Sequence, residues 1–127
     1  MATLRIGNFQ LYYEVHGEGF PVVFAHGVGG NHASWFHQVA ALAGRYRCIV
    51  FDHRGFGNSR DAADGPGRDR FVPDLLALFD HLELERACVV AQSMGGGTCA
   101  HFTWRHPKRV QSLVLADTLV GLKLPGP

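Results

Sequence analysis

The stretch that decides the fold is Ala91-Gln92-Ser93-Met94-Gly95, which joins the apolar run Ala87-Cys88-Val89-Val90 to a helix-forming stretch over residues 96–105. A serine at such a junction lies in a sharp turn from strand to helix, where the backbone is strained and the hydroxyl points outward. The small residues Ala91 and Gly95 keep that turn free of clashes with its neighbours. Because the helix N-terminus presents free N–H groups there, negative charge developing on a bound carbonyl would be stabilised beside the serine.

Three further stretches follow predicted strands in a fixed order. Residues 21–25 are typical of a buried strand and precede His26-Gly27-Val28-Gly29-Gly30. Residues 47–51 are typical of another and precede Asp52-His53-Arg54-Gly55-Phe56-Gly57-Asn58-Ser59. The stretch at 111–118 closes the series. Together with the serine turn, these motifs resemble the alpha/beta-hydrolase superfamily, especially its small-ester and lactone hydrolases, over essentially the whole chain.

The resemblance implies a role for each matching residue. Ser93 would attack an acyl carbon once a histidine removes its proton. The backbone N–H groups of Val28 and Met94 would form the oxyanion hole. Gly27, in the loop that approaches the substrate, and Gln92, beside the nucleophile, are predicted to contact the substrate. The resemblance implies a reaction that uses no metal or organic cofactor.

Four other polar residues in these motifs need an interpretation. Asp117 stands just past the last predicted strand, where some members of the superfamily carry the acid that orients the catalytic histidine, although most carry it after the next strand. His26 is expected to hold the oxyanion loop in shape rather than to exchange protons. Asp52 and Arg54 are expected to form a structural turn in which a carboxylate and a guanidinium satisfy backbone groups of the loop.

The histidine that the resemblance requires is missing. In the superfamily this base lies beyond the serine, and only His101 and His106 of the eight histidines follow Ser93. His101 is eight residues along the helix, about 12 Å down its axis, which is too far for a hydrogen bond to the serine oxygen. His106 lies at the far end of the same helix. The chain is therefore predicted to hold a nucleophile and an oxyanion hole without a base, and to be nearly inactive in isolation.

The order of elements predicts an α/β fold in which a mostly parallel sheet has an N-terminal antiparallel hairpin and flanking helices. Residues 3–6 and 9–15 flank the two-residue turn Gly7-Asn8, a pattern typical of a hairpin. Residues 1–127 are then expected to be the N-terminal part of one alpha/beta-hydrolase core domain, a truncated fold that lacks the lid and the C-terminal strands.

Two helices and a loop are predicted between these strands. Asn31 or Ser34 can cap a helix that runs to about Gly44. A second helix begins near Pro73, a residue that is well tolerated in a first helical turn. Its apolar stripe, expected to cover the sheet, consists of Val72, Leu75, Leu76, Phe79 and Leu82. Residues 61–70 are typical of a surface loop, with no function assigned.

Composition excludes several other classes of protein. The 127 residues are 46% hydrophobic and carry a net charge of +1, which suits a compact soluble domain. The Lys and Arg residues are scattered, so no nucleic-acid partner is expected. No run approaches about eighteen apolar residues, and no secretory signal begins the chain, so we expect a cytoplasmic protein without a membrane span.

The three cysteines are predicted to be free thiols. Cys48 and Cys88 lie in strands that the superfamily arrangement separates by the strand over residues 22–25. Two strand spacings amount to about 9.6 Å, more than the roughly 7 Å that a disulfide tolerates. Cys99, on the helix after the serine, is expected to be a buried structural thiol.

The strand from Val110 to Ala116 is expected to become an exposed edge, because the strands that follow it in the superfamily are absent. An apolar parallel strand expects neighbours on both sides, and an exposed edge invites pairing with another chain. Two partners are predicted for it: the missing C-terminal half of the fold, or a second copy of the chain.

The prediction for function is a serine hydrolase of carboxylic esters, lactones or related acyl substrates that works through a Ser93 acyl-enzyme. Serine at this position argues against the haloalkane dehalogenases and epoxide hydrolases of the superfamily, which use aspartate there, whereas cofactor-free haloperoxidase-type or C–C bond hydrolase activity is compatible. A noncatalytic interaction protein of the same fold is one alternative. The other is a nucleotide-binding module, suggested by Gly27-x-Gly29 and Asp52, although His32 stands where that pattern requires a third glycine.

Overall fold

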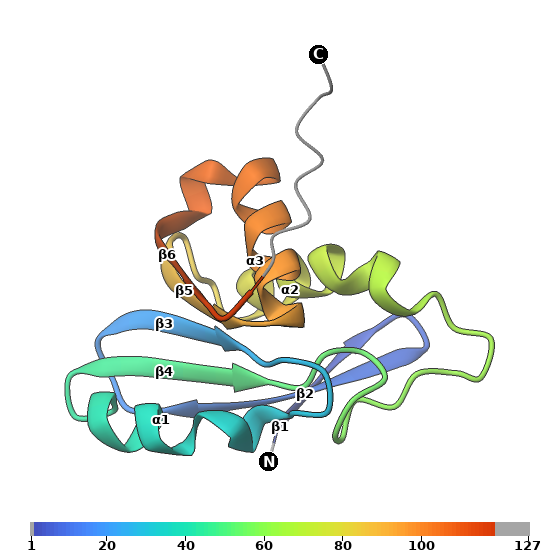
Figure 1. The fold of residues 1–127 in the computed structure, drawn as a ribbon, viewed down its shortest axis with the longest axis horizontal. Helices are drawn as coiled ribbons and strands as arrows, with labels where there is room; N and C mark the ends of the chain where they lie inside the picture. Colours follow the sequence, from blue (N-terminus) through green and yellow to red (C-terminus); the bar gives the residue numbers. More distant parts are fainter. Residues whose placement is uncertain (1, 119–127) are drawn as a thin grey trace.

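Residues 2–118 are described by a computed structural model in which one sheet carries helices on both faces (Figure 1). The strands are β1 (Ala2–Ile6), β2 (Phe9–His16), β3 (Phe20–Ala25), β4 (Tyr46–Phe51), β5 (Ala87–Gln92) and β6 (Val110–Ala116). The helices are α1 (Phe36–Leu42), α2 (Phe71–His81) and α3 (Met94–Arg105), and the 3₁₀ turns are η1 (His32–Trp35), η2 (Gly67–Arg70) and η3 (Pro107–Arg109).

The sheet order is β1-β2-β4-β3-β5-β6. β1 and β2 form the predicted antiparallel hairpin, closed by the pair Ile6 and Phe9, and β2 is also antiparallel to β4. β3, β4, β5 and β6 run parallel, with a helix in each connection between strands that are consecutive in the chain. The predicted fold class, a mostly parallel sheet with an N-terminal hairpin and flanking helices, is confirmed.

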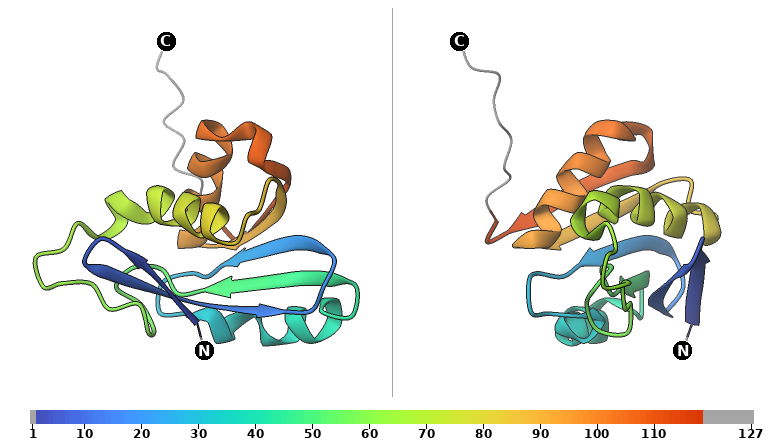
Figure 2. Two further views of the ribbon diagram at one scale, coloured as in Figure 1. Left: turned by 180° about the vertical axis from the view of Figure 1, so that it is seen from behind. Right: turned by 90° about the vertical axis from the view of Figure 1, so that its right-hand side faces the viewer.

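β3 is one of the two middle strands of the sheet, and helices lie on both faces of this sheet (Figure 2). Because side chains alternate along a strand, Val22 and Phe24 pack with Trp35 on the face that α1 covers. Val23 and Ala25 point to the opposite face, where α2 and α3 lie. That face holds the larger core, whose fully buried side chains include Leu11, Ile49, Leu75, Leu78, Phe79 and Phe102. The rigid double-sided packing of β3 fixes the loop that follows it.

The sequence signals for helix starts, a capping residue and a proline, lie at the starts of η1 and α2 in the structure. Asn31 caps η1 by accepting a hydrogen bond from the N–H of Ala33 at 2.8 Å, and Ser34 returns one by accepting from the N–H of Asn31 at 3.1 Å. Of the two predicted caps, Asn31 is therefore the cap and Ser34 its reciprocal partner. Pro73 occupies the first turn of α2, and the apolar stripe of that helix faces the sheet as predicted.

β6 lies at an edge of the sheet and pairs, within residues 2–118, with β5 alone. Val114 is 50% exposed and Leu115 is 40% exposed, so apolar side chains of this strand meet solvent. The expected exposed edge is present in the described part of the chain.

The cysteines lie where the sequence predicted. Val22 of β3 is the register partner of both Cys48 in β4 and Cys88 in β5, which places a strand between these two thiols. All three cysteines are free, and burial raises the pKa of Cys99 to about 12. Among the described residues, no helix has the length and apolar character needed to cross a bilayer.

Candidate active site

Ser93 lies at the turn between β5 and α3 and has the strained backbone that the sequence predicts. Its φ is 51° and its ψ is −116°, a region that residues with a side chain rarely adopt. Neighbouring atoms leave little room around the turn: a Cβ on Gly95 would lie 2.3 Å from the backbone carbonyl oxygen of Ala25, and one on Gly27 would lie 3.0 Å from the side-chain Cβ of Ser93. Ser93 itself is exposed, whereas Ala91 is fully buried in the strand before it.

Three hydrogen bonds hold the backbone of Ser93 in this turn. Its N–H donates to the carbonyl of Ala116 at 3.2 Å, and its own carbonyl accepts from the N–H of Gly96 at 2.8 Å. The hydroxyl of Thr118 donates to the same carbonyl at 2.6 Å. The turn is thus fastened to the segment that leaves β6 as well as to its own helix.

A cavity of about 760 Å³ opens beside Ser93. Its lining includes Val28, from the loop after β3, and Met94, from the first turn of α3. The structure therefore brings the predicted nucleophile and the two predicted oxyanion-hole residues to one cavity. Their amide roles, which depend on how a substrate would lie there, stay predictions.

The other predicted site residues are placed as follows. Asp117 lines the same cavity and has a φ of 47°. Gly27 and Gln92 lie beside the turn, since a Cβ on Gly27 would also be 3.0 Å from Oε1 of Gln92, but neither is part of the cavity lining. Their predicted contact with substrate stays a prediction.

His101 lines the cavity from the next turns of α3. Within residues 2–118, no hydrogen bond joins it to Ser93, in agreement with the predicted separation along the helix. His106 is the C-cap of the helix and contacts the ring of Phe102 at 5.1 Å between centroids. The described residues therefore give Ser93 no hydrogen-bonded base.

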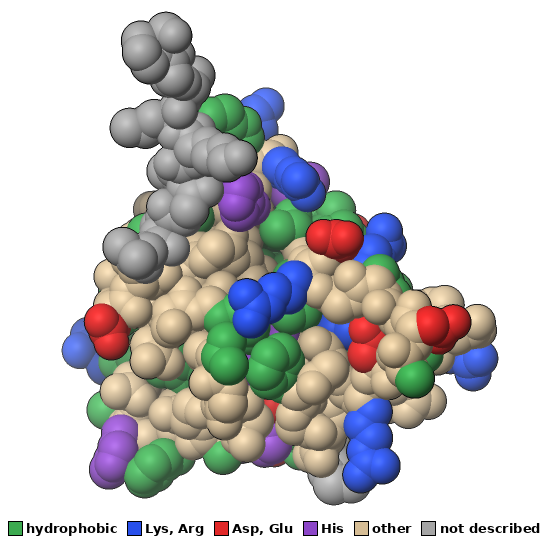
Figure 3. Space-filling model, turned by 45° about the vertical axis from the view of Figure 1, so that its right-hand side comes forward, with side chains coloured by type: hydrophobic (Ala, Val, Ile, Leu, Met, Phe, Trp, Pro, Cys, Tyr) green, Lys and Arg blue, Asp and Glu red, His purple; other side chains and the backbone are tan. Residues whose placement is uncertain are grey.

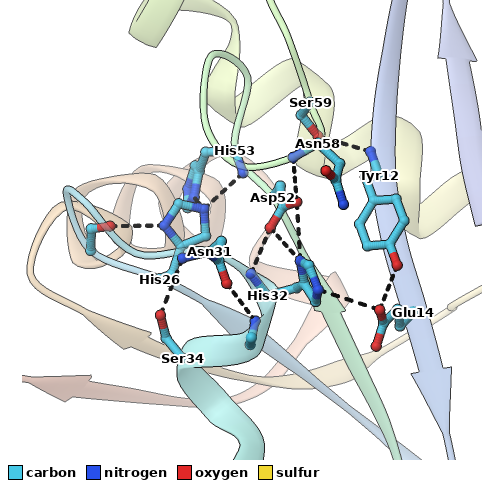
Figure 4. Close-up of polar contacts among 12 residues, drawn as sticks. Tyr12, Glu14, His26, Asn31, His32, Ser34, Asp52, His53, Asn58 and Ser59 are labelled. Carbon is cyan, nitrogen blue, oxygen red and sulfur yellow. Dashed lines mark hydrogen bonds and ion pairs between the residues drawn. The ribbon is translucent and has the colours of Figure 1, made fainter. Parts of the chain in front are cut away.

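Two buried histidines, His26 and His53, connect the loop after β3 to α3 (Figure 4). His26 Nδ1 donates to the carbonyl of Gly27 at 2.8 Å, which leaves Nε2 of the neutral ring as an acceptor. That nitrogen accepts from the backbone N–H of His53 at 2.9 Å and faces its Nδ1 at 3.2 Å. The remaining ring nitrogen of His53 then accepts from the hydroxyl of Thr98 at 3.0 Å, a residue of α3 that lines the cavity.

Both rings in this network are held neutral. Burial lowers the pKa of His26 and places that of His53 well below the ordinary value of 6.5. Burial removes the hydration that a charged imidazolium would need, so the neutral form of each ring is favoured. The predicted structural role of His26 fits these contacts, since its ring is fixed to the loop it belongs to.

Asp52 and Arg54 take different structural roles. The fully buried carboxylate of Asp52 accepts from the backbone N–H groups of His32 at 2.5 Å and of Asn58 at 2.8 Å, so it satisfies loop backbone as predicted. The guanidinium of Arg54 does not. It binds both carboxylate oxygens of Asp74 in α2, at 2.8 and 2.9 Å, so the expectation that it satisfies backbone groups is wrong.

No metal or nucleotide site is evident in the described part of the chain. Residues 2–118 contain no group of three or more His, Cys, Asp or Glu side chains that could hold a metal ion. In a dinucleotide fold, the acid at the position of Asp52 would reach a ribose hydroxyl. Here that carboxylate is fully buried and contacted by His32 and Asn58, so the contact on which the nucleotide-binding alternative depends is not available.

Comparison with known proteins settles the family. The sequence profile described as alpha/beta hydrolase fold matches residues 21–126. The chain belongs to this family. It is 39% identical over 121 residues to the non-heme chloroperoxidase CPO-A1 of Kitasatospora aureofaciens, a match that covers 94% of this chain and 44% of that protein.

Solved structures of the alpha/beta hydrolase fold resemble the chain closely. Est816, an N-acyl homoserine lactone degrading enzyme, superposes with a TM-score of 0.87 at 32% identity, over 92% of this chain and 45% of the other. The epoxide hydrolase CorEH superposes with a TM-score of 0.90 at 26% identity, over 99% of this chain and 44% of the other. The chain thus spans less than half the length of these relatives and corresponds to the N-terminal part of the alpha/beta hydrolase fold.

Sequence reasoning missed Arg68 and Thr98, which both line the cavity. Arg68 lies in η2, at the end of the stretch to which no function was assigned. Arg68 reaches the site because the loop before α2 runs back toward the cavity. The local sequence has no pattern that predicts this path. Thr98 is four positions past Met94, so helical spacing could have placed it on the same face of α3.

Proposed function

We propose that this chain supplies the nucleophile and the oxyanion hole of a serine hydrolase that acts on carboxylic esters, lactones or related acyl substrates. The observation that carries the proposal is the placement of Ser93. Its backbone has a left-handed φ, and its exposed side chain lies on the wall of a cavity that Val28 and Met94 also line. A cavity of about 760 Å³ is within the size range of small-molecule sites.

In the proposed reaction, Ser93 Oγ attacks the acyl carbon and the carbonyl oxygen becomes negatively charged. The N–H groups of Val28 and Met94, together with the N-terminus of α3, would stabilise that charge. When the intermediate collapses, the bond from the acyl carbon to the alkoxy oxygen breaks, and that oxygen takes up the proton that the base removed from Ser93 and leaves as the alcohol. Water then hydrolyses the acyl-enzyme. No metal or organic cofactor takes part in this scheme.

The scheme requires a histidine that removes the proton from Ser93, and we propose that it comes from the part of the fold outside this chain. In this arrangement residues 1–127 form the N-terminal part of the core domain, and the lid and C-terminal strands belong to the complementing part. Asp117 lines the cavity and is the candidate acid that would orient this histidine. The exposed edge of β6 is where the complementing half, or else a second copy of the chain, would add a strand.

One of the similar proteins, the lactone-degrading enzyme, supports an acyl-transfer role. Est816 is named as a lactone-degrading enzyme and the Kitasatospora relative as a non-heme chloroperoxidase. The second name favours cofactor-free haloperoxidase-type activity as a second candidate, which would use the same serine and oxyanion hole. A cytoplasmic location stays a prediction.

A fluorophosphonate probe, which reacts with activated serines, tests the proposal. We expect slow labelling of Ser93 in this chain, because a missing base costs up to about a million-fold in turnover. Labelling should become rapid when the chain is fused to the C-terminal part of the chloroperoxidase relative, which supplies the remainder of the fold. Ser93→Ala should abolish labelling of the fusion, whereas Ser112→Ala, at an exposed serine of β6, should leave it unchanged.

Equal labelling of the isolated chain and a folded fusion would contradict the proposal. If the fusion folds, as judged by circular dichroism, and neither labels nor cleaves p-nitrophenyl acetate, the noncatalytic interaction protein becomes the better interpretation.

A further inference from the structure

One positively charged side chain on the wall of the cavity beside Ser93 has no role in the proposed reaction. Arg68, from η2, lines the wall, and most of its neighbours there are apolar or uncharged, among them Val28, Phe71, Val72 and Met94. In the space-filling view, basic side chains lie across hydrophobic ones near the middle of the face (Figure 3). Arg68 itself is an exposed residue, so its charge meets solvent as well as the cavity, and its attraction for an anion is that of an exposed ion pair.

Arg68 has no carboxylate partner within residues 2–118. The arginine ion pairs of this part of the chain are made by Arg54, with Asp61 and Asp74, and by Arg109, with Asp80. Asp117 also lines the cavity, but no ion pair joins it to Arg68. The guanidinium therefore has its five N–H donors available to a molecule in the cavity.

The position of this cation relative to the site is supported by its effect on the buried network. After burial and the charge of His26, the charge of Arg68 contributes to lowering the pKa of His53, whose ring bonds Thr98 on the cavity wall. The guanidinium is thus close enough to the floor of the site for its field to act there, in the cavity that Ser93 faces.

We propose that Arg68 selects acyl substrates that carry a carboxylate arm, such as monoesters of short dicarboxylic acids or lactones with a carboxylate substituent. The ester carbonyl would lie at Ser93 while the carboxylate binds the guanidinium, an interaction for which arginine offers two parallel N–H groups. This selectivity rests on the proposed hydrolase function, because it names the substrate class of the same cavity.

Two isosteric ligands separate the charge effect from shape. Monomethyl glutarate carries the arm as a carboxylate, and methyl glutaramate carries it as a neutral amide. Dissociation constants for this chain, measured by NMR titration at low salt, should favour the anionic ester by about fivefold, the upper range for a charge pair of this exposure. Added salt should reduce the preference, because it screens the pair.

Arg68→Gln should remove the preference and Arg68→Lys should retain part of it. Arg70→Gln is the matched control, since Arg70 lies in the same 3₁₀ turn but outside the cavity lining, and it should keep the wild-type preference. Equal binding of the two esters by the wild type, or an unchanged preference in Arg68→Gln, would overturn the proposal.

Ser93→Ala separates this inference from the function on which it rests. Binding does not need the nucleophile, so Ser93→Ala should still prefer the anionic ester while losing the fluorophosphonate label. Rapid labelling of the fusion without a charge preference would refute the role of Arg68 alone. A charge preference without labelling of the fusion would refute the hydrolase and leave an anion-binding cavity.

Discussion

Replacing Gly95 by alanine tests how closely α3 packs under the nucleophile turn. The added carbon would lie 2.3 Å from the carbonyl oxygen of Ala25 and 2.8 Å from that of His26, where ordinary contact begins at 3.4 Å. Because these are backbone atoms at the end of a central strand, α3 must move away from β3 by about 1 Å. Overpacking of this kind costs about 1–3 kcal/mol, partly offset by the roughly 1 kcal/mol that alanine gains over glycine in a helix. We expect a net loss of about 1 kcal/mol, and of about 2 kcal/mol at most.

Gly97→Ala is the matched control two residues further along the helix. A Cβ at Gly97 meets no atom within 4 Å, so the same substitution should stabilise the protein by about 0.4–1 kcal/mol. The two variants should therefore differ by about 2 kcal/mol, or roughly 8 °C in Tm for a protein of this size. Urea unfolding followed by far-ultraviolet circular dichroism measures the difference.

The Gly95 substitution also has a functional readout. A displacement of about 1 Å at a reacting group can cost on the order of a hundredfold in rate, so fluorophosphonate labelling of the fused protein should slow by about that factor in Gly95→Ala. If Gly95→Ala is as stable as Gly97→Ala and labels at the wild-type rate, the close packing of α3 on β3 beneath the serine is refuted.

Three further outcomes are expected. Arg54→Met should destabilise the protein by about 3–5 kcal/mol in urea unfolding, because it leaves the buried carboxylate of Asp74 without its cationic partner. Adding Asp74→Leu should recover most of this loss. No recovery would show that the ion pair is not the cause. Burial lowers the pKa of His53 well below 6.5, so the unfolded chain takes up a proton near pH 6.5 that the folded chain excludes. The stability that depends on the neutral ring is complete above pH 6.5 and falls below it by at most about 1.4 kcal/mol per pH unit; His53→Gln should flatten this slope between pH 7.5 and 5.5, and an unchanged slope would argue against a neutral buried ring. A thiol reagent such as 5,5′-dithiobis(2-nitrobenzoic acid) should modify only the half-buried Cys88 in the native protein, and fast reaction at more than one thiol would contradict the burial of Cys48 and Cys99.

The elements that the sequence predicts well are those with local signals. The turn at Gly7-Asn8, the cap at Asn31 and the small residues around Ser93 each restrict the backbone within a few positions, and the structure has the expected feature at all three. Their physical cause lies in neighbouring residues. A single sequence is enough to recognise them.

Features that depend on distant partners could not be predicted. Arg54 was expected to bind nearby backbone, but its partner Asp74 is twenty residues further on and becomes adjacent only when α2 docks. Arg68 likewise reaches the cavity through the path of a loop that has no distinctive pattern. The base for Ser93 cannot be predicted from this chain, since neither histidine that follows the serine is hydrogen-bonded to it within the described residues.

The left-handed torsion of Ser93 makes the proposed chemistry and folding compete at one position. A side chain at such an angle costs about 1–3 kcal/mol, which glycine would not incur. A library of variants of this protein sorted only for expression or heat resistance should therefore drift from serine to glycine at residue 93. Retention of the serine through such sorting would require a second selection, one that rewards turnover.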